Sequence, residues 1–177
     1  MDPGREDALA SLERLLALDG VRGVLVHPWE ETIPANHPHV VALARAAAAR
    51  GVPAVVEAGH PMVAEAMALS DLAGRVEGAV IMTRGGQVNM SGLGQQSADF
   101  AMEAARNLHA LSTGVYRQDW LERAVARFGA ERLLHGSAAP VFSLGFQLER
   151  LRRAAMSEDE RRLVLGGNAV RLFGLAT

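Results

Sequence analysis

Amphipathic segments alternate along the chain with short runs of continuous apolar residues. The opening segment, residues 8–18, places leucines at helical spacing and is followed by Gly20, which predicts a first helix. The next segment, residues 21–28, is a β-branched run closed by a proline and is typical of a buried strand. The same strand pattern returns four times, at residues 52–59, 76–83, 108–116 and 132–140, and the helices between the strands are expected at residues 36–51, 61–74, 98–107 and 119–129.

Strands without polar alternation that are separated by helices indicate right-handed βαβ units and a parallel sheet covered by helices. We therefore predict an α/β fold in one domain, residues 1–177, with five βα units. The tail, from about residue 144, is expected to be helical. There Ser157 and Glu160 have the spacing of a capping box, and Asn168 is expected to cap the last helix.

The composition excludes several classes of function. Apolar residues make up 49% of the chain, which supports a packed core, and the formal net charge of −2 gives no argument for nucleic acid. The absence of cysteine excludes disulfides, thiolate metal sites and thiol catalysis. No apolar run approaches the length of a membrane span, and the first residues carry acids where a signal peptide carries bases. We expect a soluble cytoplasmic protein with no nucleic-acid or membrane partner.

Candidate chemistry lies where the predicted strands end. In parallel α/β proteins the carboxyl ends of the strands and the loops after them carry the functional side chains. The polar and small residues at these five strand ends are His27, Trp29, Glu30 and Glu31; Glu57 and His60; Thr83 and Arg84; Ser112 and Thr113; and His135, Ser137 and Ala138.

The order of motifs identifies a family resemblance that covers residues 8–175. The segments GVRGVLVHP, GVPAVVEAG, VIMTRGGQ, LHALSTGVYR, AERLLHGSAAP and LGGNAVRLFGL, in this order, resemble the C-terminal part of the amidohydrolase-related family. The resemblance implies a partial TIM barrel whose five strands correspond to barrel strands four to eight. It also implies a hydrolase or decarboxylase of a small carbonyl or carboxylate compound.

The resemblance further implies a metal site that this sequence does not reproduce. The family takes ligands from a His-x-His pair on the first barrel strand, a His on the fifth, often a His on the sixth, and an Asp on the eighth. The first pair is expected to be missing, and the later positions correspond to Glu57, Arg84 and Ala138. Arg and Ala offer no ligand atom, so we expect no family metal and no cofactor. A zinc site would require a different set, such as His27, His60 and His135.

The residues leave two functional hypotheses open. In the first, Glu57, Arg84 and His27 are catalytic in a metal-independent pocket, with Arg84 replacing the metal charge and pairing with Glu57. Trp29, His60, Thr113 and Ser137 then line a pocket for a carboxylate or carbonyl ligand. In the second, the Glu57–Arg84 pair is the remainder of a decayed site. The protein is then a non-catalytic subunit or small-anion-binding module that completes or regulates a partner.

Other residues are given structural interpretations. His37 and His39 are expected to be solvated at a helix start, and His135, Met62, Met67 and Met82 are expected to pack in the core. The glycine-rich segment 84–97 is interpreted either as a flexible loop or as a substrate lid. Five strands do not close a barrel, so we expect a homo-oligomer or a partner that supplies the missing strands.

Overall fold

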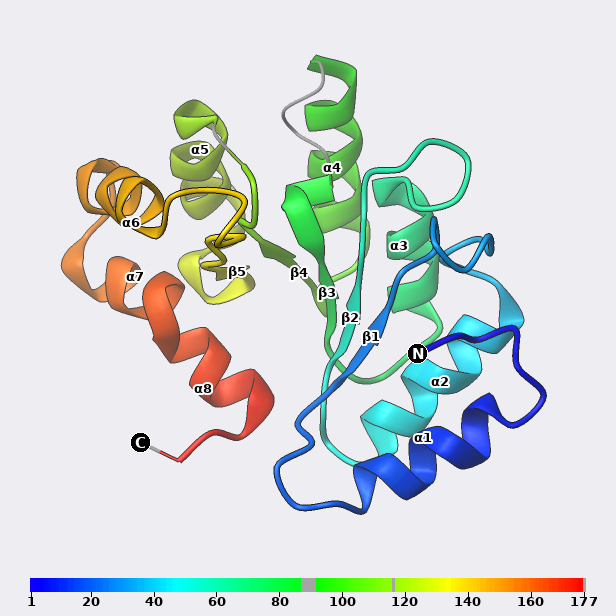
Figure 1. Ribbon diagram of the computed structural model, residues 1–177. Helices are drawn as coiled ribbons and strands as arrows, with labels where there is room; N and C mark the ends of the chain where they lie inside the picture. The colour runs from blue at the N-terminus through cyan, green and yellow to red at the C-terminus, as the bar shows by residue number, and fades with distance from the viewer. Residues whose placement is uncertain (87–91, 116, 177) are drawn as a thin grey trace.

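The computed structural model describes residues 1–86, 92–115 and 117–176, and within these ranges it confirms the predicted α/β architecture. Five parallel strands form one sheet in the order β1-β2-β3-β4-β5, so each strand pairs with the next one along the chain (Figure 1). This sequential parallel order is that of a partial TIM barrel. The strands are β1 (Val24–Val26), β2 (Ala54–Val56), β3 (Val80–Met82), β4 (Leu108–Leu111) and β5 (Leu133–Leu134).

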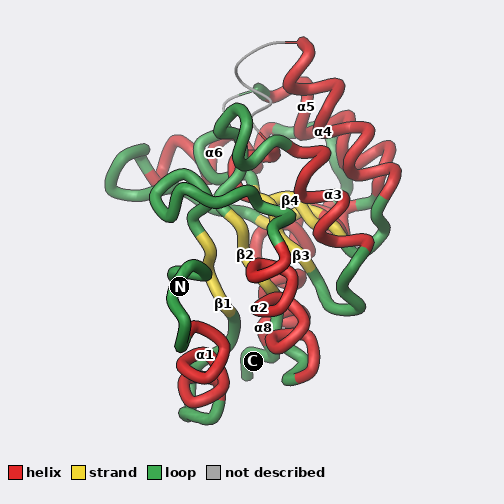
Figure 2. Tube along the Cα trace, turned by 90° about the vertical axis from the view of Figure 1, so that its right-hand side faces the viewer, coloured by secondary structure: helices red, strands yellow, loops and turns green. Residues whose placement is uncertain are grey.

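Helices connect the strands and continue past the last one. The N-terminal helix α1 packs on α2, and α8 contacts β5 (Figure 1). Helix α3 packs on α4 (Figure 2). The helices are α1 (Ala8–Leu16), α2 (Pro38–Ala49), α3 (Ala66–Gly74), α4 (Gly92–Ala104), α5 (Gln118–Phe128), α6 (Leu144–Arg153), α7 (Glu158–Arg162) and α8 (Asn168–Phe173), with 3₁₀ turns η1 (Thr83–Gly86) and η2 (Ala130–Arg132) and a π-helical segment η3 (Leu163–Gly167).

The core lies between the sheet and the helices that cover it. Alternate strand residues, such as Val24 and Val26, join the apolar cluster formed with these helices. The residues between them point to the opposite face because side chains alternate along a strand. On that face Leu25 of β1 is 52% exposed. Ile81 of β3, which is aligned with Leu25 through the intervening strand β2, is buried. One side of the sheet therefore carries the core, and the other side becomes more open towards β1.

Two helix starts differ from the predicted ones. Helix α3 begins at Ala66 rather than near Pro61, because the chain first closes a turn in which the Gly59 N–H donates to the Ala64 carbonyl at 2.6 Å. Helix α4 begins at Gly92, so the second half of the expected loop at residues 84–97 is helical. Residues 87–91 of that loop lie outside the described residues. The lid and loop interpretations therefore stay predictions.

Some of the other local predictions are confirmed, and others are wrong. The capping box of Ser157 and Glu160 is present at α7. Asn168 does not cap α8, because η3 continues into this helix and leaves no free helix start. Met82 is buried, but Met62 and Met67 are 90% and 46% exposed, so their assignment to the core is wrong. Within the described ranges, no helix has both the length and the apolar character needed to cross a bilayer.

Candidate functional site

Glu57 occupies the carboxyl end of β2, at the edge of the sheet where the sequence places candidate chemistry. Its backbone N–H donates to the Val26 carbonyl and so continues the β1–β2 ladder by one residue. Its side chain is only 14% exposed. One carboxylate oxygen, Oε1, lies 2.7 Å from Nε of Arg84, and the other, Oε2, accepts a hydrogen bond of 2.7 Å from the Thr83 hydroxyl. Sequence reasoning placed Glu57 and Arg84 on adjacent strand ends, and the structure pairs them.

Thr83 is one of the polar residues found at the predicted strand ends, but sequence reasoning gave it no role in the site. Its hydroxyl donates to Glu57 and accepts from the backbone N–H of Ala58 at 3.0 Å. The hydroxyl thereby ties the end of β3 to the end of β2 and fixes the orientation of the carboxylate. The available signal was the position of Thr83 at the strand end, directly before Arg84.

Arg84 reaches Glu57 because the backbone turns back sharply after β3. Arg84, Gly85 and Gly86 all have positive φ, at 54°, 54° and 70°. A non-glycine residue rarely adopts this left-handed conformation, and such outliers gather at functional sites. A Cβ on Gly85 would lie 2.8 Å from the ring of buried Trp120, so this turn requires glycine for space as well as for φ. The Arg84 side chain is 41% exposed.

Two histidines and a tryptophan complete the site around Glu57 and Arg84, on its β1 side. His27 follows β1, and His60 lies in the turn after β2, with their ring centroids 5.9 Å apart. The ring of Trp29 stacks on His60 at 5.1 Å with an interplanar angle of 18°. The Nδ1 atom of His27 accepts a hydrogen bond from the Glu30 N–H at 3.3 Å. One potential ligand atom from each of His27, Glu57 and His60 lies within 4.8 Å of the others.

The environment of His60 favours its neutral form. Burial lowers the pKa of His60, and the nearby charges of Arg84 and His27 lower it further, against weaker opposing effects of Glu57 and Glu30. Its Nε2 atom is buried without a hydrogen-bond partner among the described residues. A neutral imidazole with an unused nitrogen has a lone pair available as a hydrogen-bond acceptor or metal ligand.

Thr113 and Ser137 make their own local contacts at the ends of β4 and β5. The Thr113 hydroxyl fills the space in which Gly136 lacks a side chain, and the Ser137 hydroxyl accepts from the Ala139 N–H at 3.2 Å. Their assignment to the pocket stays a prediction.

His135 lies apart from the His27–Glu57–His60 cluster, so the alternative metal set that included it does not form. Its Nδ1 atom is 3.5 Å from the Ser112 hydroxyl, and its ring lines a cavity of about 10 Å³ next to Arg150. Burial, followed by the charge of Arg150, lowers the pKa of His135. His135 is therefore half-buried beside a small pocket and is not part of the apolar core cluster.

His37 and His39 form a local structure at the start of α2. His37 is the N-cap residue, whose side chain accepts from the His39 N–H, and the two rings meet edge to face at 4.8 Å. The expectation that both are simply solvated is wrong for His37, which is half-buried and caps the helix.

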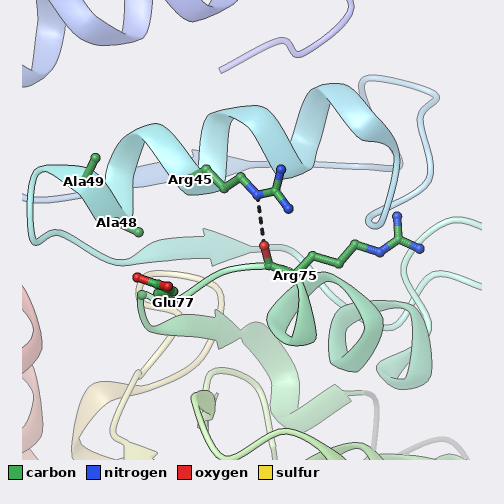
Figure 3. Close-up of a pocket in the computed structure, with 6 residues that line it drawn as sticks. Arg45, Ala48, Ala49, Arg75 and Glu77 are labelled. Carbon is green, nitrogen blue, oxygen red and sulfur yellow. Dashed lines mark hydrogen bonds between the residues drawn. The ribbon is translucent and has the colours of Figure 1, made fainter.

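The larger cavities lie elsewhere on the molecule. One of about 620 Å³ lies between α2 and the segment before β3, lined by Arg45, Arg75 and Glu77 (Figure 3). Arg45 donates from Nε to the Arg75 carbonyl at 3.0 Å and so joins α2 to the end of α3. This cavity borders the amino end of β3, whereas Glu57 lies at the carboxyl end of β2.

Comparison with protein families identifies the chain. A family model described as amidohydrolase matches residues 1–175. The chain belongs to the amidohydrolase family. No curated protein matches this amidohydrolase.

Solved structures share the fold at low sequence identity. The 5-carboxyvanillate decarboxylase of Sphingomonas paucimobilis is 16% identical, with a TM-score of 0.74, and the match covers 99% of this chain and 64% of the other. An uncharacterised TIM-barrel protein of Bordetella bronchiseptica is 20% identical, with a TM-score of 0.76 and coverages of 95% and 62%. A dihydroxybenzoic acid decarboxylase of Polaromonas, which contains manganese and the inhibitor 2-nitroresorcinol, is 16% identical, with a TM-score of 0.70 and coverages of 98% and 66%. The amidohydrolase chain thus spans about two thirds of these TIM-barrel proteins.

The site offers part of a metal-binding set. Arg84 and Ala138 have no ligand atom, and the expectation that they stand at the metal-ligand positions of the family stays a prediction. His27, Glu57 and His60, however, bring two imidazoles and a carboxylate together, which are the ligands zinc and related divalent ions take. A metal is therefore not excluded by the residues present, although the sequence predicted none.

Proposed function

We propose that this amidohydrolase binds a small carboxylate beside Glu57 and Arg84 and hydrolyses or decarboxylates it. The observation that carries the proposal is the Glu57 carboxylate, which is only 14% exposed and is paired with a half-exposed guanidinium at the carboxyl edge of a parallel sheet. Taking a carboxylate largely out of water costs free energy, and such charged groups gather at functional sites, where the carboxyl ends of parallel strands meet. Membership of the amidohydrolase family supports the reaction class.

Arg84 is the proposed anchor for the substrate carboxylate. The ion pair uses its Nε atom, and a guanidinium has four further N–H groups that can bind a carboxylate in a forked geometry. Trp29, which is 56% exposed and stacked on His60, offers a flat apolar surface beside this anchor. A planar, aromatic or unsaturated carboxylate fits this combination of charge and flat surface.

Glu57 and His27 are the proposed proton-transfer groups. Hydrolysis requires a base that takes a proton from water, and decarboxylation requires a group that returns a proton to the carbon which loses carbon dioxide. Glu57 is oriented by Thr83 for the first role, and His27, at the same edge, can carry the proton in the second. If His27, Glu57 and His60 instead hold a divalent cation, their ligand atoms would be occupied, and the cation would take over the activation of water or the polarisation of a carbonyl.

Turnover assays on the full chain test this function. The protein is incubated with hydroxybenzoates and with carboxylated lactones, and carbon dioxide release and ring opening are followed by chromatography, with and without added Mn²⁺ or Zn²⁺. Glu57→Gln should lower kcat by about 100-fold or more, the usual effect of losing a general base. Arg84→Gln should mainly raise KM. Arg152→Gln, on the distant helix α6 and 69% exposed, is the matched control and should change neither constant.

A second candidate is a non-catalytic module that binds a small anion. It is favoured by the engagement of both Glu57 oxygens, one with Arg84 and one with Thr83, because a carboxylate whose two oxygens already have partners is less accessible to a substrate proton. In that case calorimetry detects carboxylate binding that Arg84→Gln abolishes, while no substrate in the panel is turned over. Turnover that Glu57→Gln leaves unchanged contradicts the catalytic assignment of this residue.

A further inference from the structure

We propose that His27, Glu57 and His60 form a divalent-cation site whose occupancy is coupled, through Arg84, to the binding of the small carboxylate. This inference rests on the proposed function for the identity of the anion. The ligand set differs from the one that the family resemblance implies, because only Glu57 belongs to both. The coupling follows from the competition of two cationic groups for one carboxylate.

The three side chains are arranged as an open three-ligand site. Their ligand atoms lie within 4.8 Å of one another, and each of the three residues is partly buried. Zinc-ligand bonds are about 2.0–2.2 Å long, so a cation would draw the three groups closer by small side-chain rotations. Two imidazoles and one carboxylate, with a further position open, are a common set for a catalytic divalent ion.

His60 is the member of the set that most needs a partner. Its Nε2 atom is buried, and no hydrogen bond to it is found in the described part of the chain. Buried polar atoms are nearly always paired, since an unpaired one costs the free energy of its desolvation. The stacking of Trp29 fixes the plane of the His60 ring and so limits the directions in which this nitrogen can point. A cation would satisfy it.

Arg84 competes with the cation for Glu57. Its Nε atom lies 2.7 Å from Oε1, and Thr83 already donates to Oε2, so both carboxylate oxygens have partners. A divalent cation and a guanidinium repel each other, and a cation that takes Oε1 therefore displaces Arg84. The Arg84 side chain is 41% exposed and can swing outwards, where its N–H groups become free to bind a carboxylate.

Binding of the carboxylate should in turn favour binding of the cation. A carboxylate that draws Arg84 away from Glu57 releases Oε1 for the cation. Because coupling between two binding sites is reciprocal, each ligand must tighten the binding of the other by the same factor. Arg84 is thus both the group that holds the metal-ligand oxygen and the anchor of the anion.

Isothermal titration calorimetry on the metal-free full chain without an affinity tag tests the coupling. Zinc chloride is titrated with and without saturating benzoate, and benzoate is titrated with and without zinc. We expect one zinc ion per chain and a mutual tightening of about tenfold, within the usual range for coupled sites. Arg84→Gln should bind zinc more tightly than the unmodified protein and should lose the effect of benzoate. Glu57→Gln and His60→Ala should lose the zinc site.

The control is the other histidine pair of the chain. His37 and His39, whose rings are 4.8 Å apart at the start of α2, could also hold zinc, and the double variant H37A/H39A removes them. If the H37A/H39A variant no longer binds zinc, the inference is overturned. It is also overturned if Arg84→Gln binds zinc more weakly than the unmodified chain does.

The two proposals fail separately. Coupled binding of zinc and benzoate without turnover of any substrate supports the cation site and contradicts the proposed catalysis. Turnover that persists in the presence of a chelator, with no zinc bound to the protein, contradicts the cation site alone.

Discussion

Gly85 is the position where a single methyl group should test how the site is built. Gly85→Ala places a Cβ 2.8 Å from Cη2 of Trp120, a residue of α5 that is only 1% exposed. The backbone there also has a φ of +54°, which an alanine adopts at a cost of about 1–2 kcal/mol. Overpacking of a core contact adds about 1–3 kcal/mol. The expected loss of unfolding free energy is therefore about 2–5 kcal/mol.

Two other glycines separate these contributions. Gly51 has a φ of +69°, and no atom lies within 4 Å of the point that a Cβ would occupy, so Gly51→Ala carries the backbone cost alone. Gly74, at the end of α3, has neither the left-handed backbone nor a close neighbour, and Gly74→Ala should be neutral or slightly stabilising. Thermal unfolding followed by circular dichroism compares the three variants, and Tm should fall by about 4–20 °C in Gly85→Ala.

The refuting result is a Gly85→Ala variant no less stable than Gly51→Ala. That result would mean that the ring of Trp120 does not limit the approach of the turn after β3. Because Arg84 precedes Gly85 directly, displacement of this turn should also weaken carboxylate binding, which the two control variants should leave unchanged.

Three further predictions concern stability. Burial, followed by the charges of Arg171 and Arg132, lowers the pKa of His109 from 6.5 to about 4, so the unfolded chain binds this proton more strongly. The free energy of unfolding should therefore fall by about 3 kcal/mol because of this histidine when the pH is lowered from 6.5 to 4. Urea titrations of His109→Leu at the two pH values should show a decrease that is smaller by this amount. Asn168→Ala should cost about 2–4 kcal/mol in the same assay, because two buried backbone carbonyls lose their donor at 2.7 Å. Ser157→Ala should cost about 1 kcal/mol through the lost cap, and an unchanged midpoint would contradict that role.

The pairing of Glu57 with Arg84 could be predicted because it depends on topology alone. Parallel neighbouring strands end at one edge of a sheet, so residues that follow β2 and β3 directly must approach each other. The register agrees with this, with Val56 opposite Met82, one residue before Glu57 and two residues before Arg84. The catalytic roles of these residues stay predictions.

The place of His60 could not be predicted in the same way, because it depends on a turn rather than on a strand. Residues 61–65 have a composition that favours a helix, but the chain forms a turn in which Met62 has a φ of 71°. This turn carries His60 back over Trp29 and leaves Met62 exposed. The spacing of apolar residues does not predict such a turn, because the turn depends on hydrogen bonds between neighbouring backbone groups.

Asn168 shows how tertiary contacts can override a local signal. An asparagine before an apolar helix is a common N-cap, but here the preceding segment is itself helical. The amide instead donates to the carbonyls of Ala130 and Leu133 and anchors α8 to the strand β5. Only the packed structure brings these carbonyls within reach, since they lie more than 30 residues earlier in the chain.

The stacking of Trp29 on His60 gives the protein a built-in optical reporter. The chain has two tryptophans, and the second, Trp120, is buried against Gly85. Ultraviolet emission that shifts or is quenched when a molecule arrives beside Glu57 should therefore originate from Trp29. A Trp29→Phe variant, which lacks the emission of Trp29, is the control. Ligand binding beside Glu57 can then be followed over time without an attached dye.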